Sequence, residues 1–426
     1  MPRKSSSAPA VDKDRSSLSR KRSQPSLAQS ASPLVGEGRG GRGEGLQRNV
    51  CFVTGTRADF GLMQSTLRAI QSHPALNLQL IATGMHLDPA HGRTLNQLRA
   101  EGWPTDATIP WKPAKNDLTQ LAQQTGQATA RLAATFEQLK TDIALVVGDR
   151  VEAFAAATAA HLAGRVLAHV HGGDRAMGQV DDALRHAITK LAHLHFPATK
   201  QSAQRIAKLG EERRRIHCVG SPGIDGITSD ATPWSIHCPI TLAQHRRKFA
   251  LMVLHPTDAD DDLEYRRAKS LLGLCRGIGF PEIQAVYPNN DPGSHGIIRA
   301  IREAVSSGLV DFQENLYRDF YLGLLRDAAC LVGNSSSGII EAASFGTPVV
   351  DIGPRQAGRE RGHNVTTVPF TKTAIRRALA KIWNNGHPLR YRPHNIYGAG
   401  RTASRITQIL ARTPLTPALR RKLINY

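Results

Sequence analysis

Consecutive serines and a glutamate follow a short apolar run in the last quarter of the chain. Residues 331–332 lead into Ser335 and Ser336, and a helical pattern opens at Ile339 with Glu341 in its first turn. Backbone N–H groups at a helix N-terminus lack partners and carry partial positive charge. Small hydroxyl side chains can add hydrogen bonds to phosphate oxygens. This segment therefore has the donor groups that an anion site needs.

A basic loop follows the next apolar run. After residues 348–352 come Arg355, Arg359 and Arg361, and their guanidinium groups suit phosphate. A serine cap and a solvated basic loop would be the simpler interpretation of either segment alone. The two segments together favour a site for a nucleotide diphosphate.

Other polar side chains stand where apolar runs end, which is the usual place for ligand sites in parallel sheets. They are Arg57, Asp59, His86, Asp149, Arg150, His169, His171, Asp174, His255, Asn289, Ser336 and Arg355. Asp181 and Asp182 open a further helical pattern, where a carboxylate stabilises the helix N-terminus. Held near a cleft, either carboxylate could also act as a general acid or base, as could His171 and Asp174.

The elements that must position these side chains are short apolar runs that alternate with longer amphipathic patterns. The expected strands cover residues 50–54, 78–83, 143–147, 166–170, 194–197, 251–254, 283–287, 331–332 and 348–352. The expected helices begin at residue 62, cover 118–139, 152–162 and 181–193, and begin again near 297, 316 and 339. This alternation predicts an α/β fold of doubly wound parallel sheets.

The alternation is interrupted over residues 220–247, where Pro and Gly become frequent, so the sequence predicts two Rossmann-like domains that face each other across a cleft. Residues 1–49 carry ten Lys/Arg and four Asp/Glu and show no apolar periodicity, which indicates disorder. The expected division is a disordered basic tail (1–48), a first domain (49–221), a second, nucleotide-binding domain (222–395) and a C-terminal segment (396–426).

Composition excludes several classes of protein. The 426 residues are 40% hydrophobic, which is enough for two cores, but only 5% aromatic, which disfavours a stacking platform for single-stranded nucleic acid. The net charge is +20, of which residues 1–49 contribute +6; the remaining +14 fits an anionic small substrate and equally a weak attraction to nucleic acid. No apolar run is long enough to cross a membrane, and five scattered cysteines without a CxxC pair indicate reduced thiols. We therefore expect a cytoplasmic protein without a membrane partner or a specific nucleic-acid partner.

Familiar cofactor and metal motifs are missing from the sequence. It has no GxxxxGK[ST], no GxGxxG opening the first unit and no HExxH. These absences disfavour a P-loop ATPase, a dinucleotide cofactor and a catalytic zinc site. We expect neither a cofactor nor a metal ion.

Nine collinear segments resemble the UDP-N-acetylglucosamine 2-epimerases, most closely the hydrolysing branch of bacterial sialic-acid pathways. They are TGTRADFGL, TGMHLD, VVGDRVE, HVHGGD, DDALRHAITKLAHLHF, LHP, YPNNDPGS, GNSSSGIIEA and GTPVVDIGPRQAGRERG. The resemblance runs from Val50 to the C-terminus. It implies a GT-B fold, in which the C-terminal segment crosses back onto the first domain, and a reaction without NAD.

The implied reaction converts UDP-N-acetylglucosamine and water into N-acetylmannosamine and UDP. UDP leaves by elimination across carbons 1 and 2, and water adds to the resulting 2-acetamidoglucal with inversion at carbon 2. The departing diphosphate needs a fixed positive field, and proton removal and return need poised carboxylates or imidazoles. A UDP-sugar is thus the expected partner. We also expect a homo-oligomer, either a dimer or a tetramer.

The resemblance assigns roles residue by residue. The implied acid and base positions are Asp149, His171 and Asp181, with His86 and Asp174 nearby. The implied UDP-binding residues are Arg57, Arg150, His255, Asn289, Ser335, Ser336, Glu341 and Arg355. Asp174 stands where this branch usually has Glu, and a side chain one methylene shorter would draw the carboxylate back from its partner.

Three other functions are compatible with the same residues. Two are enzymes: a hydrolysing 2-epimerase of UDP-N,N′-diacetylbacillosamine in a legionaminic-type pathway, and a non-hydrolysing UDP-N-acetylglucosamine 2-epimerase. The third is a basic nucleotide- or RNA-binding protein that keeps the fold without the chemistry. Release of free UDP from a UDP-sugar separates the hydrolysing enzymes from the binding protein, and the filled acid and base positions disfavour the latter.

Overall fold

The computed structural model describes residues 47–88, 94–111, 118–175, 181–231, 248–288, 292–308, 310–313, 316 and 318–425. They belong to one compact unit, Gly45–Tyr426. Asn289 and residues 1–46 of the expected basic tail lie outside the described residues. Within the described ranges, no helix is long and apolar enough to cross a bilayer.

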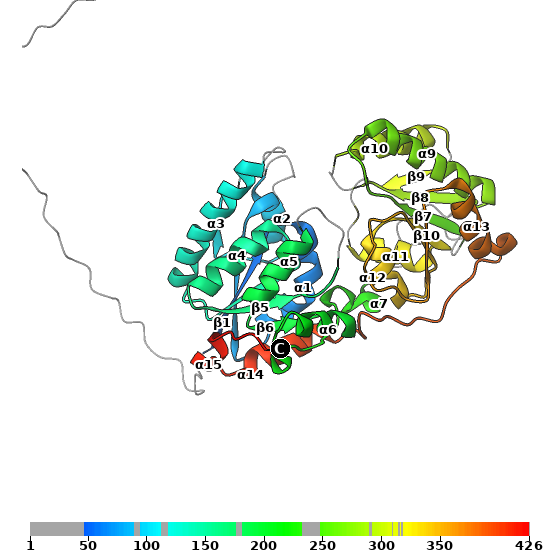
Figure 1. Ribbon diagram of the computed structural model, residues 1–426. Coiled ribbons are helices and arrows are strands. Elements are labelled where there is room, and N and C mark those ends of the chain that lie inside the picture. The colour runs from blue at the N-terminus through cyan, green and yellow to red at the C-terminus, as the bar shows by residue number, and fades with distance from the viewer. Residues whose placement is uncertain are drawn as a thin grey trace, which may run out of the picture. The chain divides into compact units, whose positions relative to one another are not determined.

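The first half of the described chain forms a parallel six-stranded sheet in the order β3-β2-β1-β4-β5-β6. Its strands are β1 (Arg48–Thr54), β2 (Leu76–Ala82), β3 (Ala107–Thr108), β4 (Ile143–Val147), β5 (Val166–Val170) and β6 (Leu194–Phe196). One face packs against α1 (Arg57–Gln71) and α2 (Thr94–Ala100). The other face packs against α3 (Leu118–Gln138), α4 (Val151–Leu162) and α5 (Asp181–Leu191), as Figure 1 shows. The short helix α6 (Lys200–Lys208) follows β6.

Alternate residues of each strand feed the two opposite faces of this sheet. Val50 and Phe52 of β1 join the core beside α1, whereas Cys51 and Val53 join the core beside α3 and α4. All four side chains are buried. Because helices cover both faces, the strands appear in the sequence as continuous apolar runs and not as an alternating pattern.

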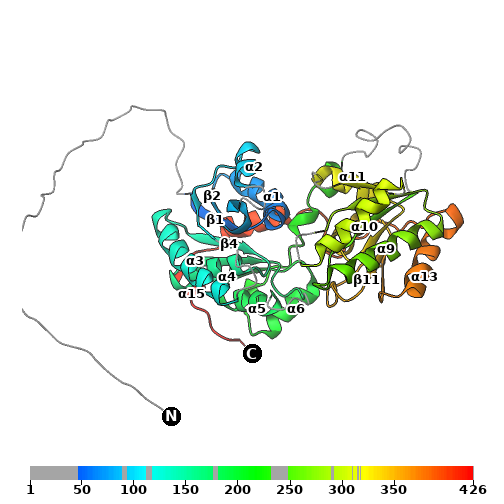
Figure 2. The ribbon, with the colours of Figure 1, turned by 90° about the horizontal axis from the view of Figure 1, so that it is seen from above.

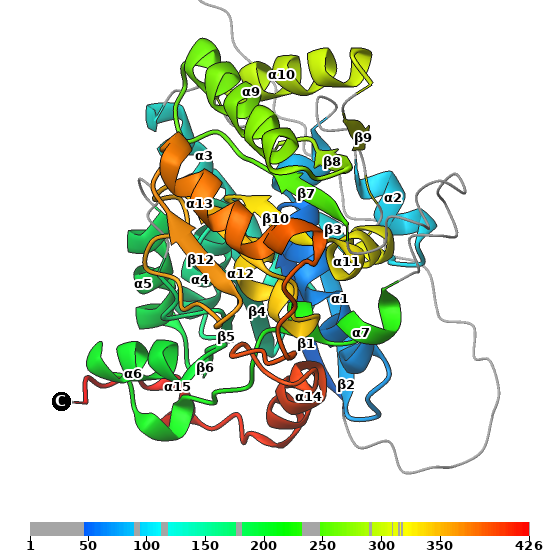
Figure 3. The ribbon, with the colours of Figure 1, turned by 90° about the vertical axis from the view of Figure 1, so that its right-hand side faces the viewer.

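The second half forms another parallel six-stranded sheet, in the order β12-β11-β10-β7-β8-β9. Its strands are β7 (Phe249–Val253), β8 (Glu282–Val286), β9 (Asp311–Gln313), β10 (Cys330–Gly333), β11 (Val349–Ile352) and β12 (Val365–Val368). Figure 3 looks onto the face covered by α9 (Asp261–Ile278), α10 (Ser294–Ser306) and α13 (Lys372–Trp383). The other face packs against α7 (Ile227–Asp230), α11 (Arg318–Asp327) and α12 (Ser336–Ile340).

The two sheets have the same topology. In each one the chain begins in the middle, winds to one edge, returns to the middle and winds to the other edge, which is the strand order of a Rossmann fold. The order reverses between β1 and β4 in the first sheet and between β7 and β10 in the second. Ligands bind at the carboxyl ends of the strands beside such a reversal. The predicted fold of two doubly wound Rossmann-like domains is confirmed.

The C-terminal segment returns to the first sheet. Helix α14 (Thr402–Arg412) packs against α1, as Figure 2 shows, and Ile406 and Leu410 join the core of the first sheet. The Arg48 guanidinium donates to the carbonyl oxygen of Leu410 at 2.8 Å. A short helix, α15 (Pro417–Arg420), follows. The residue limits of the four expected segments stay a prediction.

Two helices begin clearly before the expected residue. Helix α1 begins at Arg57, not at residue 62, because Thr56 caps it there by accepting the N–H of Asp59. Helix α12 begins at Ser336, not at Ile339, and Glu341 lies at its C-terminal cap, not in its first turn. The reason is local: the Ser335 hydroxyl accepts the N–H of Ser337 and starts the helix three residues early. The sequence pattern also did not single out β3, β9 and β12, which are short edge strands, or the helices α9 and α13.

Candidate active site

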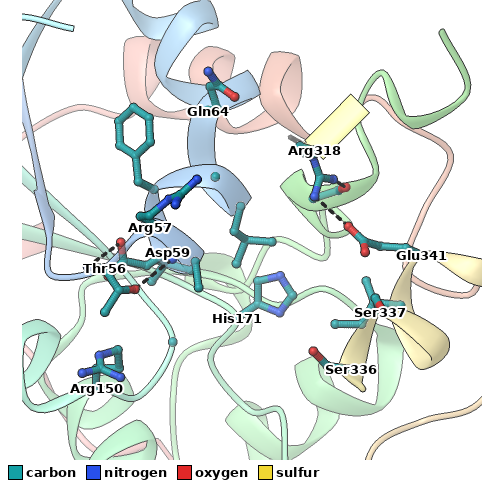
Figure 4. Close-up of a pocket in the computed structure, with 18 of the residues that line it drawn as sticks. Thr56, Arg57, Asp59, Gln64, Arg150, His171, Arg318, Ser336, Ser337 and Glu341 are labelled. Carbon is teal, nitrogen blue, oxygen red and sulfur yellow. Dashed lines mark hydrogen bonds and ion pairs between the residues drawn. The ribbon is translucent and has the colours of Figure 1, made fainter. Parts of the chain in front are cut away.

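A cavity of about 760 Å³ lies at the carboxyl ends of the strands. Residues after β1, β4 and β5 line it from the first sheet, and residues of α11 and α12 line it from the second. Figure 4 shows Arg57 and Arg150 on one side, Ser336 and Glu341 on the other, and His171 between them. Two clusters of candidate residues that are far apart in the sequence therefore meet in one cavity.

The first wall of the cavity is the N-terminus of α1. Thr56 caps this helix by accepting the N–H of Asp59 at 3.2 Å, and the Asp59 carboxylate accepts the N–H groups of Gly55 and Thr56 at 3.0 and 3.1 Å. The Thr54 hydroxyl donates to the same carboxylate. Burial raises the pKa of Asp59 to about 6, although these hydrogen bonds oppose the rise. Asp59 therefore takes up a proton just below neutral pH. The exposed Arg57 lies two residues before it and also lines the cavity.

His86 supports this wall from behind. Its side chain is 0% exposed, with Nε2 3.0 Å from the Thr54 hydroxyl and Nδ1 2.8 Å from the Thr94 hydroxyl. Burial lowers the pKa of His86 to about 4, so the ring is neutral at neutral pH. His86 is not among the residues that line the cavity. Its link to the cavity runs through Thr54 and Asp59.

His171 follows β5 and is held by two buried partners. Its φ of 62° lies in the left-handed region, which non-glycine residues rarely adopt. Nδ1 lies 2.7 Å from Oδ2 of Asp174, and Nε2 lies 3.0 Å from the hydroxyl of Ser221. The expectation that the shorter Asp174 side chain would be drawn back from its partner is thus wrong for the His171 ring.

The two residues after β4 take different partners. Asp149 forms an ion pair with Arg185 of α5, and the same guanidinium donates to the His171 carbonyl oxygen at 2.9 Å. Arg150 donates to the buried Glu152 carboxylate through Nε and Nη2, at 3.1 and 3.2 Å. Asp149 and Arg150 both line the cavity. Arg185 therefore ties the Asp149 carboxylate to the backbone of His171.

The opposite wall is the turn between β10 and α12. Ser336 and Ser337 line the cavity, and Ser335 lies behind them with its Oγ 3.0 Å from that of Ser337. The hydroxyl of Tyr321, on α11, also contacts the Ser337 hydroxyl. Helix packing therefore orders the hydroxyl groups of this turn.

Glu341 lies on the same wall and pairs with an arginine from α11. Nη1 of Arg318 is 2.8 Å from Oε1 of Glu341. The second amino group of Arg318 donates to the carbonyl oxygen of Gly223, which also lines the cavity. Figure 4 shows the Arg318–Glu341 pair facing the cavity.

Comparisons with known proteins identify the family of the chain. Residues 68–411 match the UDP-N-acetylglucosamine 2-epimerase family, which is most of the chain. The chain belongs to this family.

Two relatives show how similar the chain is to characterised members. It is 35% identical to a hydrolysing UDP-N,N′-diacetylbacillosamine 2-epimerase of Legionella pneumophila, over 89% of this chain and 100% of that protein. It is 31% identical to a UDP-N-acetylglucosamine 2-epimerase of Neisseria meningitidis serogroup B, over 80% of this chain and 89% of the relative.

A solved structure supports the fold. The crystal structure of the Neisseria meningitidis UDP-N-acetylglucosamine 2-epimerase bound to its UDP-sugar matches with a TM-score of 0.70, over 86% of this chain and 100% of that one. The aligned residues are 19% identical, so this match supports the GT-B fold alone. The family and the fold that the sequence motifs implied are both confirmed.

The structure brings most of the predicted residues to the cavity of this epimerase-family chain. Those that line it are Arg57, Asp149, Arg150, His171, Asp174, Ser336 and Glu341. His255 and Arg355 are not among the lining residues, and both contact Asn334, two residues before Ser336. The backbone N–H of His255 donates to Oδ1 of Asn334 at 2.7 Å, and Nη1 of Arg355 donates to its carbonyl oxygen at 3.1 Å. Asp181 is the first residue of α5, and Asn289 lies outside the described residues.

The sequence placed Asp59 among the polar residues at strand ends but assigned it no role, although its Thr-x-x-Asp capping box is visible there. Three other side chains that shape the site were not selected. Arg318, Tyr321 and Ser221 carry no such local signal, because their partners are distant in the sequence. In the part of the chain that the structure describes, no cluster of three or more His, Cys, Asp or Glu side chains is arranged to hold a metal ion.

Proposed function

We propose that this protein is a hydrolysing 2-epimerase of a UDP-2-acetamido sugar. The observation that carries the proposal is that one cavity holds Arg57 on one wall, Ser336 and Glu341 on the other, and the His171–Asp174 pair between them. Cationic and hydroxyl groups suit a nucleotide diphosphate, and a histidine paired with a carboxylate suits proton transfer.

The nucleotide end belongs to the second sheet in this proposal. Glu341 accepts hydrogen bonds from the ribose hydroxyl groups, and Arg318 orients its carboxylate. Ser336 donates to a phosphate oxygen, with Ser335 ordering the turn behind it. His255, Asn289 and Arg355 complete the nucleotide side. Arg57 and Arg150, from the first sheet, face the diphosphate and stabilise the charge that develops when it leaves.

The chemistry takes place at the sugar, beside the first sheet. A base removes the proton from carbon 2 while the carbon 1–oxygen bond breaks, and UDP departs with the bonding electrons. The product is a 2-acetamidoglucal. Water then adds its hydroxyl to carbon 1, and an acid returns a proton to carbon 2 from the opposite face. We assign these proton transfers to Asp149, His171 and Asp181. Asp174 holds the His171 ring, and His86 holds the Thr54–Asp59 pair.

UDP-N-acetylglucosamine is the substrate that we propose first, with N-acetylmannosamine and UDP as products for a sialic-acid-type pathway. UDP-N,N′-diacetylbacillosamine is the second candidate. One observation favours it: the Legionella pneumophila relative, 35% identical and matched over its whole length, bears that substrate in its name. Both sugars present the same acetamido group at carbon 2, so the same residues serve either reaction. A homo-oligomer stays a prediction.

The decisive experiment is a reaction of the purified protein with each UDP-sugar in deuterated water. We expect free UDP and a free 2-epimeric sugar that carries deuterium at carbon 2, both measured by NMR. A product without that deuterium would exclude the elimination route. Accumulation of the epimeric UDP-sugar would assign a non-hydrolysing epimerase, and tight UDP binding without turnover would assign a binding protein. The faster of the two sugars identifies the substrate.

A further inference from the structure

The turn over residues 221–225 touches both functional ends of the cavity. Ser221 caps a short 3₁₀ turn, Pro222–Ile224. Its hydroxyl is 3.0 Å from Nε2 of His171, on the first sheet's side. Two residues later, the Gly223 carbonyl oxygen accepts a hydrogen bond from Arg318, the partner of Glu341 on the second sheet's side. One short turn thus contacts the proposed acid–base histidine and, through Arg318, the proposed ribose-binding glutamate.

Hydrogen bonds to two other segments of the chain fix this turn. The Ser65 hydroxyl of α1 donates to the Pro222 carbonyl oxygen at 3.2 Å. The Ser221 N–H donates to the Tyr397 carbonyl oxygen at 2.7 Å, and the Thr402 N–H donates to the Asp225 carboxylate at 2.9 Å. Tyr397 and Thr402 belong to the segment that returns to the first sheet. The turn therefore lies where the chain leaves the first sheet and where its C-terminal segment returns to that sheet.

Hydrogen-bond roles around Ser221 can be assigned from its neighbours. Its oxygen accepts the Gly223 N–H at 3.3 Å, so its own O–H is free to donate to Nε2 of His171. The second oxygen of Asp174 accepts the Ser202 hydroxyl at 2.7 Å, and the first faces Nδ1 of His171. A proton on Nδ1 then satisfies Asp174, and the lone pair of Nε2 accepts the Ser221 hydroxyl. Ser221, at 0% exposure, does not itself reach the cavity.

We propose that Ser221 is a positioning residue that fixes the ring of His171. We also propose that its turn holds the acid–base end and the ribose end of the cavity in a fixed position relative to each other. This inference rests on the proposed function, because it takes His171 as a proton-transfer group and Glu341 as a nucleotide ligand. Ser221 acts at one end through its hydroxyl. The Gly223 carbonyl acts at the other end through Arg318, whose two amino groups span the distance between that carbonyl and Glu341.

Substitutions at the two ends of the cavity should have different kinetic effects. Ser221→Ala removes only the hydroxyl, and should lower kcat by about tenfold, the value of one hydrogen bond, with an unchanged KM. Ser221→Thr restores the hydroxyl and most of kcat. Arg318→Lys keeps the charge but cannot span two acceptors, so it should raise KM for the UDP-sugar on the order of tenfold with little change in kcat. Ser229→Ala, on the exposed side of the same segment, is the matched control and should change neither constant.

An NMR measurement on the ring of His171 separates this inference from the proposed function. In the wild-type protein labelled with ¹⁵N-histidine, we expect one tautomer with the proton on Nδ1 and a single ring orientation, whatever the substrate. In Ser221→Ala, with one anchor left, we expect exchange-broadened or doubled ring signals. Unchanged ring signals in this variant, or a proton on Nε2 in the wild type, would overturn the positioning role. If the ring responds as expected but no UDP-sugar is turned over, the proposed function fails and the structural role of Ser221 stands.

Discussion

Oδ2 of Asp174 lies 2.7 Å from Nδ1 of His171, and both side chains are buried beside the cavity. Burial alone would raise the pKa of Asp174. The neighbouring His171 and Arg185 and the hydrogen bond from Ser202 outweigh burial and hold the pKa below its ordinary value. Asp174 therefore stays ionised at neutral pH and can orient the imidazole ring, in the way that a buried carboxylate orients a catalytic histidine.

Asp174→Asn tests this pairing. The amide keeps the size of the side chain but removes its charge and one of its two acceptor oxygens. We expect kcat for the UDP-sugar to fall on the order of 10²-fold, the lower bound for a positioned acid or base, with UDP affinity nearly unchanged. Initial rates of UDP release and calorimetric titration with UDP measure the two effects. Asp230→Asn, an exposed aspartate of α7, is the control. Equal losses of UDP affinity and turnover would contradict the assignment of Asp174 to the chemical step.

The sequence predicted the structure well where the deciding pattern lies within one short segment. Buried strands such as Ile143–Val147 are continuous apolar runs, and their bounds match the prediction. The polar residues after them converge because parallel strands share one carboxyl edge, so Asp149 and His171 could be placed near each other without a structure. Edge strands such as β12, with exposed Thr366 and Thr367, lack that apolar signal.

Side-chain direction and long-range partners could not be predicted. His86 follows β2 as expected, yet its ring turns into the interior to meet Thr54 and Thr94. Arg318 reaches Glu341 and Gly223, across 23 and 95 residues of sequence, because α11, α12 and the turn that contains Gly223 pack together at the second sheet. Ser221 lies in a segment whose Pro and Gly content indicated only a linker.

Arg57→Ala tests the nucleotide end of the site. Arg57 is exposed and lines the cavity, so its removal leaves the fold intact and takes one guanidinium away from the diphosphate. A hydrogen bond to a charged group contributes about 1.5–3 kcal/mol, which corresponds to a loss of UDP affinity of roughly 10- to 150-fold. Calorimetric titration with UDP measures the change. Arg99→Ala, an exposed arginine of α2, should bind UDP like the wild type. An unaltered UDP affinity in Arg57→Ala would remove Arg57 from the diphosphate site.

Buried histidines predict a loss of stability in acid. Burial lowers the pKa of His169 to about 3, and its Nε2 lies 2.8 Å from the Gly148 carbonyl oxygen. Below the ordinary histidine pKa of about 6.5, His169 binds a proton in the unfolded chain but stays neutral in the folded chain. The free energy of unfolding therefore falls as the pH falls from 6.5 toward 3. Between pH 6.5 and 5 this one group should cost about 2 kcal/mol of unfolding free energy.

Urea unfolding at pH 7 and pH 5 measures that dependence. His169→Asn cannot titrate, so its unfolding free energy should change less between the two pH values than that of the wild type. His295→Asn removes an exposed histidine of α10 and serves as the control. A pH dependence as steep in His169→Asn as in the wild type would show that other groups account for the acid sensitivity.

Lys422→Met tests how the C-terminal segment is anchored. The Lys422 ammonium donates to the buried Glu211 carboxylate and to the Ala192 carbonyl oxygen, and Glu211 also pairs with Lys190 at 2.7 Å and His195 at 3.1 Å. Methionine fills the same space without the charge, so Glu211 keeps two partners and loses the third. Leaving a buried group short of one partner costs about 1–3 kcal/mol, and we expect the melting temperature to fall by several degrees. Lys208→Met, an exposed lysine of α6, should melt like the wild type.

Lys422→Met should have little effect on turnover. The segment that Lys422 anchors also contains Tyr397, whose carbonyl oxygen fixes Ser221. As long as α14 remains packed on α1, turnover at a temperature well below melting should therefore stay normal. A normal melting temperature in Lys422→Met would show that α14, and not the residues after it, fastens this segment to the first sheet.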